Sequence, residues 1–219
     1  DPEISQDVSE LFNYLTGFSK QTRFRKLLIA PLSLREGIIE RIRREAALAR
    51  KSGEGRLIFK LNSLVDPEVI DALYEASESG VEIDLIVRGI CCLRPGVKGL
   101  SSRIRVVSII GRFLEHSRIY WFKNGGAEEA FIGSADMMRR NLDRRVEVLA
   151  PVESKDLIDL LVKEALLPAL RDTDGAWELS SGGRYRRLRP KPVDRSFSSQ
   201  EAMALRPLAA MQGHLDAVE

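Results

Sequence analysis

The order of apolar and polar positions divides the chain into short apolar runs and longer segments of helical period. Runs of about four to eight apolar or β-branched residues are typical of buried strands, whereas apolar positions three and four residues apart are typical of one helix face. The runs predict strands at 25–30, 56–61, 81–87, 104–109, 118–123, 129–132 and 145–149. The helical spacing predicts helices at 5–15, 33–52, 66–79, 136–142 and 154–170.

Local start and stop signals support these helices. Ser33 and Glu36 have the spacing of a capping box, in which the Ser33 hydroxyl accepts from the Glu36 amide, and Gly53 ends the same helix. Asp66 precedes a proline, so it is predicted to cap the next helix, which Gly80 closes. The inner face of the last of these helices is predicted to carry Leu157, Leu160, Leu161, Ala165 and Leu167.

The strand pattern predicts an α/β fold with a mixed sheet. Strand, helix and strand alternate up to residue 87, which is typical of a parallel arrangement with ligands beyond the carboxyl ends of the strands. The strands that follow are separated by turns, including Asn124-Gly125-Gly126. A hairpin of 177–179 with 185–188 and a helix capped by Ser198 that runs through Leu208 are expected as a partly mobile appendage.

We therefore expect a mixed sheet flanked by helices, with a small C-terminal hairpin and helix. The expected division is an N-terminal helical lead-in at 1–24, one α/β domain at 25–171 and a C-terminal extension at 172–219. A length of 219 residues is enough for one sizeable domain with an appendage.

Composition excludes several classes of protein. Hydrophobic residues make up 44% and charged residues 30% of the chain, the balance of a globular protein and not of a disordered or fibrous one. No stretch approaches the roughly 18 apolar residues of a membrane span, and no signal peptide pattern opens the chain. Adjacent Cys91 and Cys92 are expected to be reduced thiols, and with only His116 and His214 beside them they do not make a zinc site. A cytoplasmic protein is expected, with peripheral membrane association left open.

The net charge of +2 is unevenly distributed. Residues 88–145 carry 12 basic and 5 acidic side chains, a net charge of +7. Such a segment is a candidate surface for anions, although basic runs are also commonly solvated faces. Few aromatic residues accompany the positive charge for stacking on bases, so specific nucleic-acid binding is not expected.

One constellation of polar residues lies in and just after this basic segment. His116 and Arg118 stand at the entry to a predicted strand, Ser134 and Asp136 follow in a Gly-Ser-x-Asp string, and Glu147 lies on the next strand. The arrangement resembles the half-site of the phospholipase D-like superfamily, in which His-x-Lys is followed by Gly-Ser-x-Asn and two copies meet across a pseudo-twofold axis. Arg118 and Asp136 depart from that pattern, which disfavours a generic phosphodiesterase.

Longer strings resemble one branch of that superfamily more closely. The segments similar to the C-terminal part of bacterial polyphosphate kinases are 15–19, 27–32, 60–66, 85–91, 113–118, 124–126, 134–138 and 141–147. The resemblance covers about residues 10–170, and it is specific because several long strings agree in order. The tail after residue 172 is less diagnostic.

The resemblance implies the C-terminal catalytic half of an ATP:polyphosphate phosphotransferase, which moves the terminal phosphoryl of ATP reversibly onto polyphosphate through a phosphohistidine. In the family that histidine lies in a preceding homologous domain, in a Lys-Ile-His-Ala-Lys-like string that this sequence lacks. The implied ligands are ATP or ADP and polyphosphate, with magnesium bound mainly by the preceding domain and no metal ligand assigned here. The remaining domains are the implied partners, and the full enzyme is expected to be a homo-oligomer. Beginning at Asp1 without methionine favours a fragment, which alone is expected to be inactive.

The resemblance places the family's two ligand positions on Arg88 and His116 and its conserved acid on Glu147. The planar, permanently charged guanidinium of Arg88 suits phosphoryl oxygens. Histidine gains and loses a proton near neutral pH, so His116 could donate to the leaving ADP oxygen. Glu147 could orient an imidazole or form an ion pair with Arg144 or Arg118. Weaker candidates for phosphate-binding or supporting groups are Arg118, Ser134, Asp136, Arg139 and Arg140.

Other interpretations stay open at this point. A phospholipase D-type phosphodiesterase or nuclease could pair two half-sites in a homodimer, although Arg118 and Asp136 count against it. The chain could also be a non-catalytic module that binds polyanions. Without the resemblance, His116 would be read as a surface or packing residue and Arg88 as an ordinary salt-bridged arginine.

Overall fold

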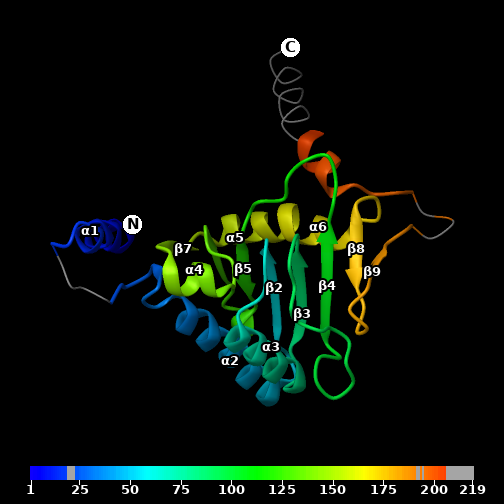
Figure 1. Cartoon of the computed structure of the whole chain (residues 1–219), viewed down its shortest axis with the longest axis horizontal. Helices are drawn as coiled ribbons and strands as arrows, with labels where there is room; N and C mark the ends of the chain where they lie inside the picture. The colour runs from blue at the N-terminus through cyan, green and yellow to red at the C-terminus, as the bar shows by residue number, and fades with distance from the viewer. Residues whose placement is uncertain (19–22, 191–192, 194, 206–219) are drawn as a thin grey trace, which may run out of the picture.

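A computed structural model of the protein describes residues 1–18, 23–190, 193 and 195–205. Within this part of the chain, a nine-stranded mixed sheet lies between helices on both of its faces (Figure 1). The strands lie in the order β1-β7-β6-β5-β2-β3-β4-β8-β9. The α/β fold with a mixed sheet, expected from the sequence, is confirmed.

The parallel part of the sheet forms where strand, helix and strand alternate. Its strands are β2 (Arg56–Leu61), β3 (Glu82–Val87) and β4 (Ile104–Ile109). Between β2 and β3 runs α3 (Pro67–Glu78), with a proline in its first turn. The Asp66 carboxylate caps this helix by accepting the Val69 N–H at 3.1 Å, as the sequence predicts.

The strands on the other side of β2, away from β3, are antiparallel to their neighbours. They are β5 (Ile119–Phe122), β6 (Glu129–Gly133), β7 (Glu147–Val152) and β1 (Leu28–Ala30). β5 pairs with β2, and each later strand pairs with the one before it in this series. The expectation that the first strand belongs to a simple parallel series is therefore wrong. The meander of β5, β6 and β7 separates it from β2.

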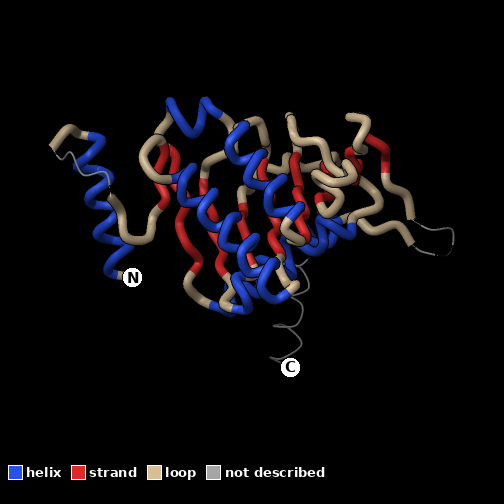
Figure 2. Tube along the Cα trace, turned by 90° about the horizontal axis from the view of Figure 1, so that it is seen from below, coloured by secondary structure: helices blue, strands red, loops and turns tan. Residues whose placement is uncertain are grey.

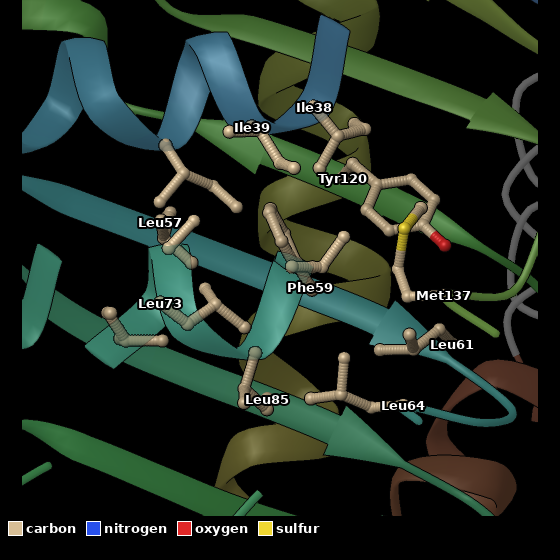
Figure 3. Close-up of a cluster of buried hydrophobic side chains, with 14 of the residues drawn as sticks. Ile38, Ile39, Leu57, Phe59, Leu61, Leu64, Leu73, Leu85, Tyr120 and Met137 are labelled. Atoms are coloured by element: carbon tan, nitrogen blue, oxygen red, sulfur yellow. The ribbon is translucent and has the colours of Figure 1, made fainter. Parts of the chain in front are cut away.

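The alternation of side chains along the central strands fills two hydrophobic layers. On one face, α2 (Leu34–Ser52) and α3 cover the sheet. Figure 3 shows Ile38 of α2 and Leu73 of α3 beside Phe59 of β2 in this layer. The Phe59 ring also contacts the Tyr120 ring edge-on, with ring centroids 5.0 Å apart. These buried side chains hold the ends of β2 and β5, and hence the site, in place.

The opposite face is covered by α5 (Lys155–Leu161) and α6 (Leu167–Arg171), joined by a π-helical turn. Pro168 has no N–H to donate to the preceding turn, which is the local reason for the irregular hydrogen bonding. The predicted inner face is wrong in part, because Leu157 and Leu160 are exposed while Ile158 and Leu166 are buried. Apolar residues surround this helix on most sides, so hydrophobicity alone does not fix which side faces the sheet.

The N-terminal helix α1 (Pro2–Leu15) lies at the end of the sheet, beside β1 (Figure 2). Its buried Asp7 carboxylate accepts the backbone N–H groups of Arg25, Lys26 and Leu27 at 2.7 to 3.0 Å. These amides are therefore not available to a neighbouring strand. This is why β1 begins at Leu28 and not at residue 25, where the apolar run predicts it.

The predicted hairpin forms from β8 (Ala176–Leu179) and β9 (Tyr185–Arg187). β8 pairs with β4 in the antiparallel sense, so the hairpin continues the main sheet and is not a separate appendage. After it, residues 199–205 are helical. The rest of the last predicted helix, to Leu208, lies outside the described residues.

Two further local predictions differ from the structure. The capping box at Ser33 is wrong, because its hydroxyl accepts the Ile29 N–H at 3.2 Å across the turn after β1 and does not cap α2. The short helix predicted from residue 136 begins later, as α4 (Arg139–Arg144). Met137 is extended because its carbonyl accepts the N–H groups of residues 65 and 66 at 2.7 and 2.9 Å. Among the described helices, none has the length and apolar composition needed to cross a bilayer.

Candidate functional site

The sheet topology brings the candidate residues to one edge of the sheet. Arg88 follows the carboxyl end of β3, which is parallel to β2. His116 precedes β5, which is antiparallel to β2 and therefore starts where β2 ends. Asp136 follows the end of β6, and Glu147 begins β7, which is antiparallel to β6. All four residues thus lie at the edge where β2 and β3 end, which is where parallel sheets commonly bind ligands.

A buried ion pair lies at this edge. Arg118 Nη2 donates to Asp136 Oδ2 at 2.9 Å, and the two side chains are only 12% and 8% exposed. The Asp136 carboxylate also accepts the backbone N–H groups of Asn62 at 2.6 Å and Ser63 at 3.2 Å. The pair therefore ties the loop after β6 to the end of β2. It also neutralises the Arg118 charge within the protein.

His116 is exposed, and Arg118 holds it from one side. Arg118 Nη1 donates to the His116 carbonyl at 2.8 Å and lies 3.1 Å from ring Nδ1 and 3.2 Å from Nε2. With its amide oxygen toward Arg118, Asn62 accepts from Nη2 at 2.6 Å and donates to the Glu115 carbonyl at 2.7 Å. The main chain around His116 is thus fixed while the imidazole remains accessible from solvent.

A buried lysine holds the residues on either side of His116. Lys60, near the end of β2, has a side chain only 5% exposed. Its Nζ donates to Ser117 Oγ at 2.8 Å and forms an ion pair with Glu115. These three residues and Arg88 line the same small hollow. Arg88 and the loop that carries His116 are therefore neighbours in space.

Arg88 has a donor without a partner. Its Nη1 is covered by protein atoms and makes no hydrogen bond, while the residue as a whole is partly exposed. Its backbone is fixed, since its N–H donates to the Leu61 carbonyl at 3.2 Å and its carbonyl accepts from Ser108 Oγ at 3.1 Å. An unpaired buried donor costs about 1–3 kcal/mol, more when it is charged, so such a group calls for an explanation. An anionic ligand at this edge would supply one.

Ser134 has a structural contact that the sequence does not reveal. Its hydroxyl accepts the Val148 N–H at 3.2 Å, and its own N–H donates to the Val148 carbonyl at 3.1 Å. The residue before it, Gly133, has no room for a Cβ, which would overlap the Val148 carbonyl. The Gly-Ser pair therefore allows β6 and β7 to approach closely beside the site.

Glu147 is buried and is bonded within its own loop. It accepts a hydrogen bond from Asn141, and its Oε1 lies 3.9 Å from Arg145 Nη1. The ion pair considered from the sequence, with Arg144 or Arg118, is therefore not the one that forms. Among the described residues, no hydrogen bond joins Glu147 to His116.

Arg139 and Arg140 lie in a different hollow from the residues above. This hollow, of about 580 Å³, adjoins the start of α4, and both arginines are exposed. Its lining residues are Arg35, Glu68, Arg139, Arg140, Asp143 and Arg144. The lining has more basic than acidic side chains. Because α4 begins three residues after Asp136, the hollow is close along the chain to the site.

Comparison with known proteins identifies a family and relatives that match most of the chain. The family described as "Polyphosphate kinase C-terminal domain 2" matches residues 27–200. A polyphosphate kinase from Synechocystis is 52% identical over 208 residues, which are 95% of this chain and 28% of the relative. The chain belongs to the polyphosphate kinase family. It spans less than a third of the length of that kinase relative.

Solved structures of similar proteins include a polyphosphate kinase from Porphyromonas gingivalis. Its TM-score is 0.90 at 39% identity, over 98% of this chain and 32% of that chain. Nuc from Salmonella typhimurium, a phospholipase D family member, has a TM-score of 0.49 at 13% identity over 75% of this chain. The kinase family match reaches residue 200, beyond the limit near 170 that the sequence strings indicated. The C-terminal hairpin therefore belongs to the matched part.

Several polar residues at the edge were missed by sequence reasoning. They are Lys60, Asn62, Glu115, Ser117 and Gln200. Lys60 and Asn62 lie in a string that resembles the kinases, but nothing in that string distinguishes a buried lysine from an exposed one. A charged residue at the last inward position of a buried strand is the one signal that could have identified Lys60.

Proposed function

We propose that this chain is the C-terminal catalytic half of an ATP:polyphosphate phosphotransferase, which works together with a preceding domain that carries the phosphohistidine. Membership of the polyphosphate kinase family supports this proposal. The observation that carries it is that Arg88, with its unpartnered donor, lies beside the loop of His116 at the edge of the sheet where β2 and β3 end. The proposal places the enzyme in the cytoplasm as a homo-oligomer.

In this mechanism the two residues have different tasks. Arg88 offers permanent positive charge to the oxygens of the phosphoryl group in transfer, over which charge is spread in the transition state. His116 donates a proton to the oxygen of the leaving ADP while the histidine of the other domain attacks phosphorus. Because, in the part of the chain that the structure describes, no hydrogen bond joins Glu147 to His116, Glu147 would instead orient the histidine of the preceding domain, across the pseudo-twofold axis.

The acidic groups of the site do not fit a magnesium ion. Asp136 accepts from Arg118 and from two backbone N–H groups, and Glu147 accepts from Asn141, so their oxygens already have donors. Nowhere in the described ranges do three His, Cys, Asp or Glu side chains gather as metal ligands would. In the proposed enzyme, the ATP phosphates and the preceding domain would bind the magnesium ion.

The same contacts argue against a homodimeric phosphodiesterase. That reaction needs a free cation beside the histidine to bind the phosphate. Every side-chain nitrogen of Arg118 has a protein partner, and its charge is neutralised by Asp136. The half-site therefore has no free cation at the position that is lysine in the phospholipase D-like pattern.

Incubation with γ-labelled ATP and magnesium tests the proposal. The chain alone should carry no label and make no polyphosphate, because the nucleophilic histidine is absent. When the chain is joined to the preceding part of a polyphosphate kinase, label transfer should appear. An unmodified full-length kinase is the positive control. Stable label on His116 of the isolated chain would contradict the assigned roles.

A further inference from the structure

Glu115, next to His116, is held by two elements that are far apart in the sequence. One carboxylate oxygen forms the ion pair with Lys60 of β2. The other accepts a hydrogen bond from Gln200 Nε2 at 2.7 Å, across 85 residues of chain. The Glu115 side chain is 21% exposed, so these contacts are only partly screened by water.

Gln200 binds the loop at further points. Its Nε2 donates to the Phe113 carbonyl at 2.8 Å, and its Oε1 accepts the Phe113 N–H at 2.9 Å. Gln200 is only 8% exposed. A Cβ at Gly111 would overlap the Gln200 amide, so the absence of a side chain at that position leaves room for the glutamine. The loop and the amide therefore fit each other.

Gln200 is itself fixed by the chain before the hairpin. The buried Asp172 carboxylate accepts both the N–H and the hydroxyl of Ser199 at 2.7 Å. Figure 1 shows the short orange-red helix of residues 199–205 beside the green loop between β4 and β5. The helix thus has a rigid support from which Gln200 reaches the loop.

We propose that Lys60 and Gln200 are positioning residues that hold His116 through Glu115. Lys60 secures Glu115 and Ser117 on the two sides of the histidine, and Gln200 secures Glu115 and the backbone of Phe113. The C-terminal helical turn thereby belongs to the catalytic apparatus. This inference rests on the proposed role of His116, but the positioning itself is measurable without any transfer reaction.

Nuclear magnetic resonance of this chain measures the positioning directly. Its histidines are His116 and His214, so the ring C–H signals of His116 are assigned with His116→Ala. Gln200→Leu should move these signals toward the values of an unfolded peptide. It should also speed hydrogen exchange of the Phe113 amide by about fivefold, the factor for one net hydrogen bond. Glu201→Leu, which changes an exposed side chain on the same helical turn, should leave both unchanged.

A second variant separates positioning from folding. Glu115→Gln keeps the side-chain shape but has one oxygen for two donors, so it should shift the His116 signals in the same direction as Gln200→Leu. The double variant should add little, because both changes break the same connection. Unchanged His116 signals in Gln200→Leu, with the loop still protected, would overturn the proposal.

A kinetic readout distinguishes this inference from the proposed function. In a full-length polyphosphate kinase with these residues, Gln200→Leu should lower kcat with little change in KM for ATP, as expected when a reacting group is misplaced and binding is retained. If His116→Ala has no effect on transfer while Gln200→Leu shifts the His116 signals, the positioning stands and the proposed function fails. If Gln200→Leu raises only KM, the positioning role is wrong.

Discussion

Two arginines at the same edge differ in how their nitrogens are used. Each side-chain nitrogen of Arg118 has a partner in the protein, whereas Arg88 Nη1 has none. Removing a partner of a buried ion pair leaves an uncompensated charge, so Arg118 and Asp136 are needed for the fold at this edge. Arg88, in contrast, has charge available for a ligand. In the proposed function, ligand binding and stability are thus assigned to two different arginines at the same edge of the sheet.

His116→Ala and Arg88→Ala in a full-length kinase test this separation of roles. Loss of a positioned proton donor should slow transfer by roughly 10²–10⁴-fold, and added imidazole should partly restore the rate. The Arg88→Ala defect should not respond to imidazole, because it removes charge and not a proton donor. Single-turnover transfer from ATP is the measurement. A His116→Ala enzyme with the unmodified rate would show that the imidazole has no chemical role.

Gly133→Ala should disturb the close approach of β6 and β7. The added Cβ would overlap the Val148 carbonyl, so the backbone must shift, and we expect the free energy of unfolding to fall by about 1–3 kcal/mol. The matched control is Gly182→Ala in the hairpin turn, where the nearest atom to a Cβ is Ser180 Oγ at 3.9 Å. Urea unfolding of both variants gives the comparison. Equal stabilities would mean that the strands adapt without cost.

Among the elements, those whose signals are local are the ones that the sequence predicts best. β2 and β4 have the predicted ends, and Asp66 caps α3, because apolar runs and caps depend on neighbours in the chain. The start of β1 could not be predicted, since it depends on the distant Asp7 carboxylate. Gln200 was missed for the same reason, because its contact with the His116 loop joins residues 85 positions apart.

The attachment of α1 should depend on pH through Asp7. Burial opposes ionisation of this carboxyl group, but the N–H groups of residues 25–27 outweigh it, so its pKa is lowered. A lowered pKa in the folded state means stabilisation that is present at neutral pH and lost as the pH falls below about 4. Asp7→Asn should therefore reduce the free energy of unfolding by about 1.5–3 kcal/mol at pH 7 and by less at pH 3.

Urea unfolding at the two pH values, followed by far-ultraviolet circular dichroism, measures this difference. Glu10→Gln is an unsuitable control because Glu10 also contacts Arg25. Ser9→Ala is the better one, because Ser9 is exposed on α1 and its hydroxyl donates to the Ser5 carbonyl of the same helix, and it should behave alike at both pH values. If the difference in the free energy of unfolding between Asp7→Asn and the unmodified chain is as large at pH 3 as at pH 7, the Asp7 charge does not have this role.

Across the whole molecule, positive charge is concentrated in residues 88–145, the segment that also contains Arg88 and His116 of the proposed site. The net charge of +7 in residues 88–145 includes Arg139 and Arg140, which follow Asp136 closely in the chain and line a hollow at the start of α4. Polyphosphate is a repeating anion, so its binding should release counterions and weaken as salt rises. The overall net charge of +2 would not by itself indicate such a surface.

Calorimetry of the chain with polyphosphate at two salt concentrations tests this distribution. Raising salt from about 0.05 to 0.2 M should lower the affinity by about ten- to a hundredfold if several cations contact the chain of phosphates. Replacing Arg139 and Arg140 with alanine should flatten this salt dependence. Replacing two basic residues outside the segment, Arg43 and Arg50 of α2, should not. If the affinity does not depend on salt, the basic segment does not bind polyphosphate.

The pairing of β8 with β4 has a consequence for any shortened form of this chain. A chain cut after residue 171, where composition changes, would keep β4 but lose the strand that covers its outer side. The exposed N–H and C=O groups of β4 would then be free to pair with the same edge of another molecule. Such a truncation should therefore self-associate and precipitate, and retaining the hairpin through residue 190 should keep the protein monodisperse at the same concentration.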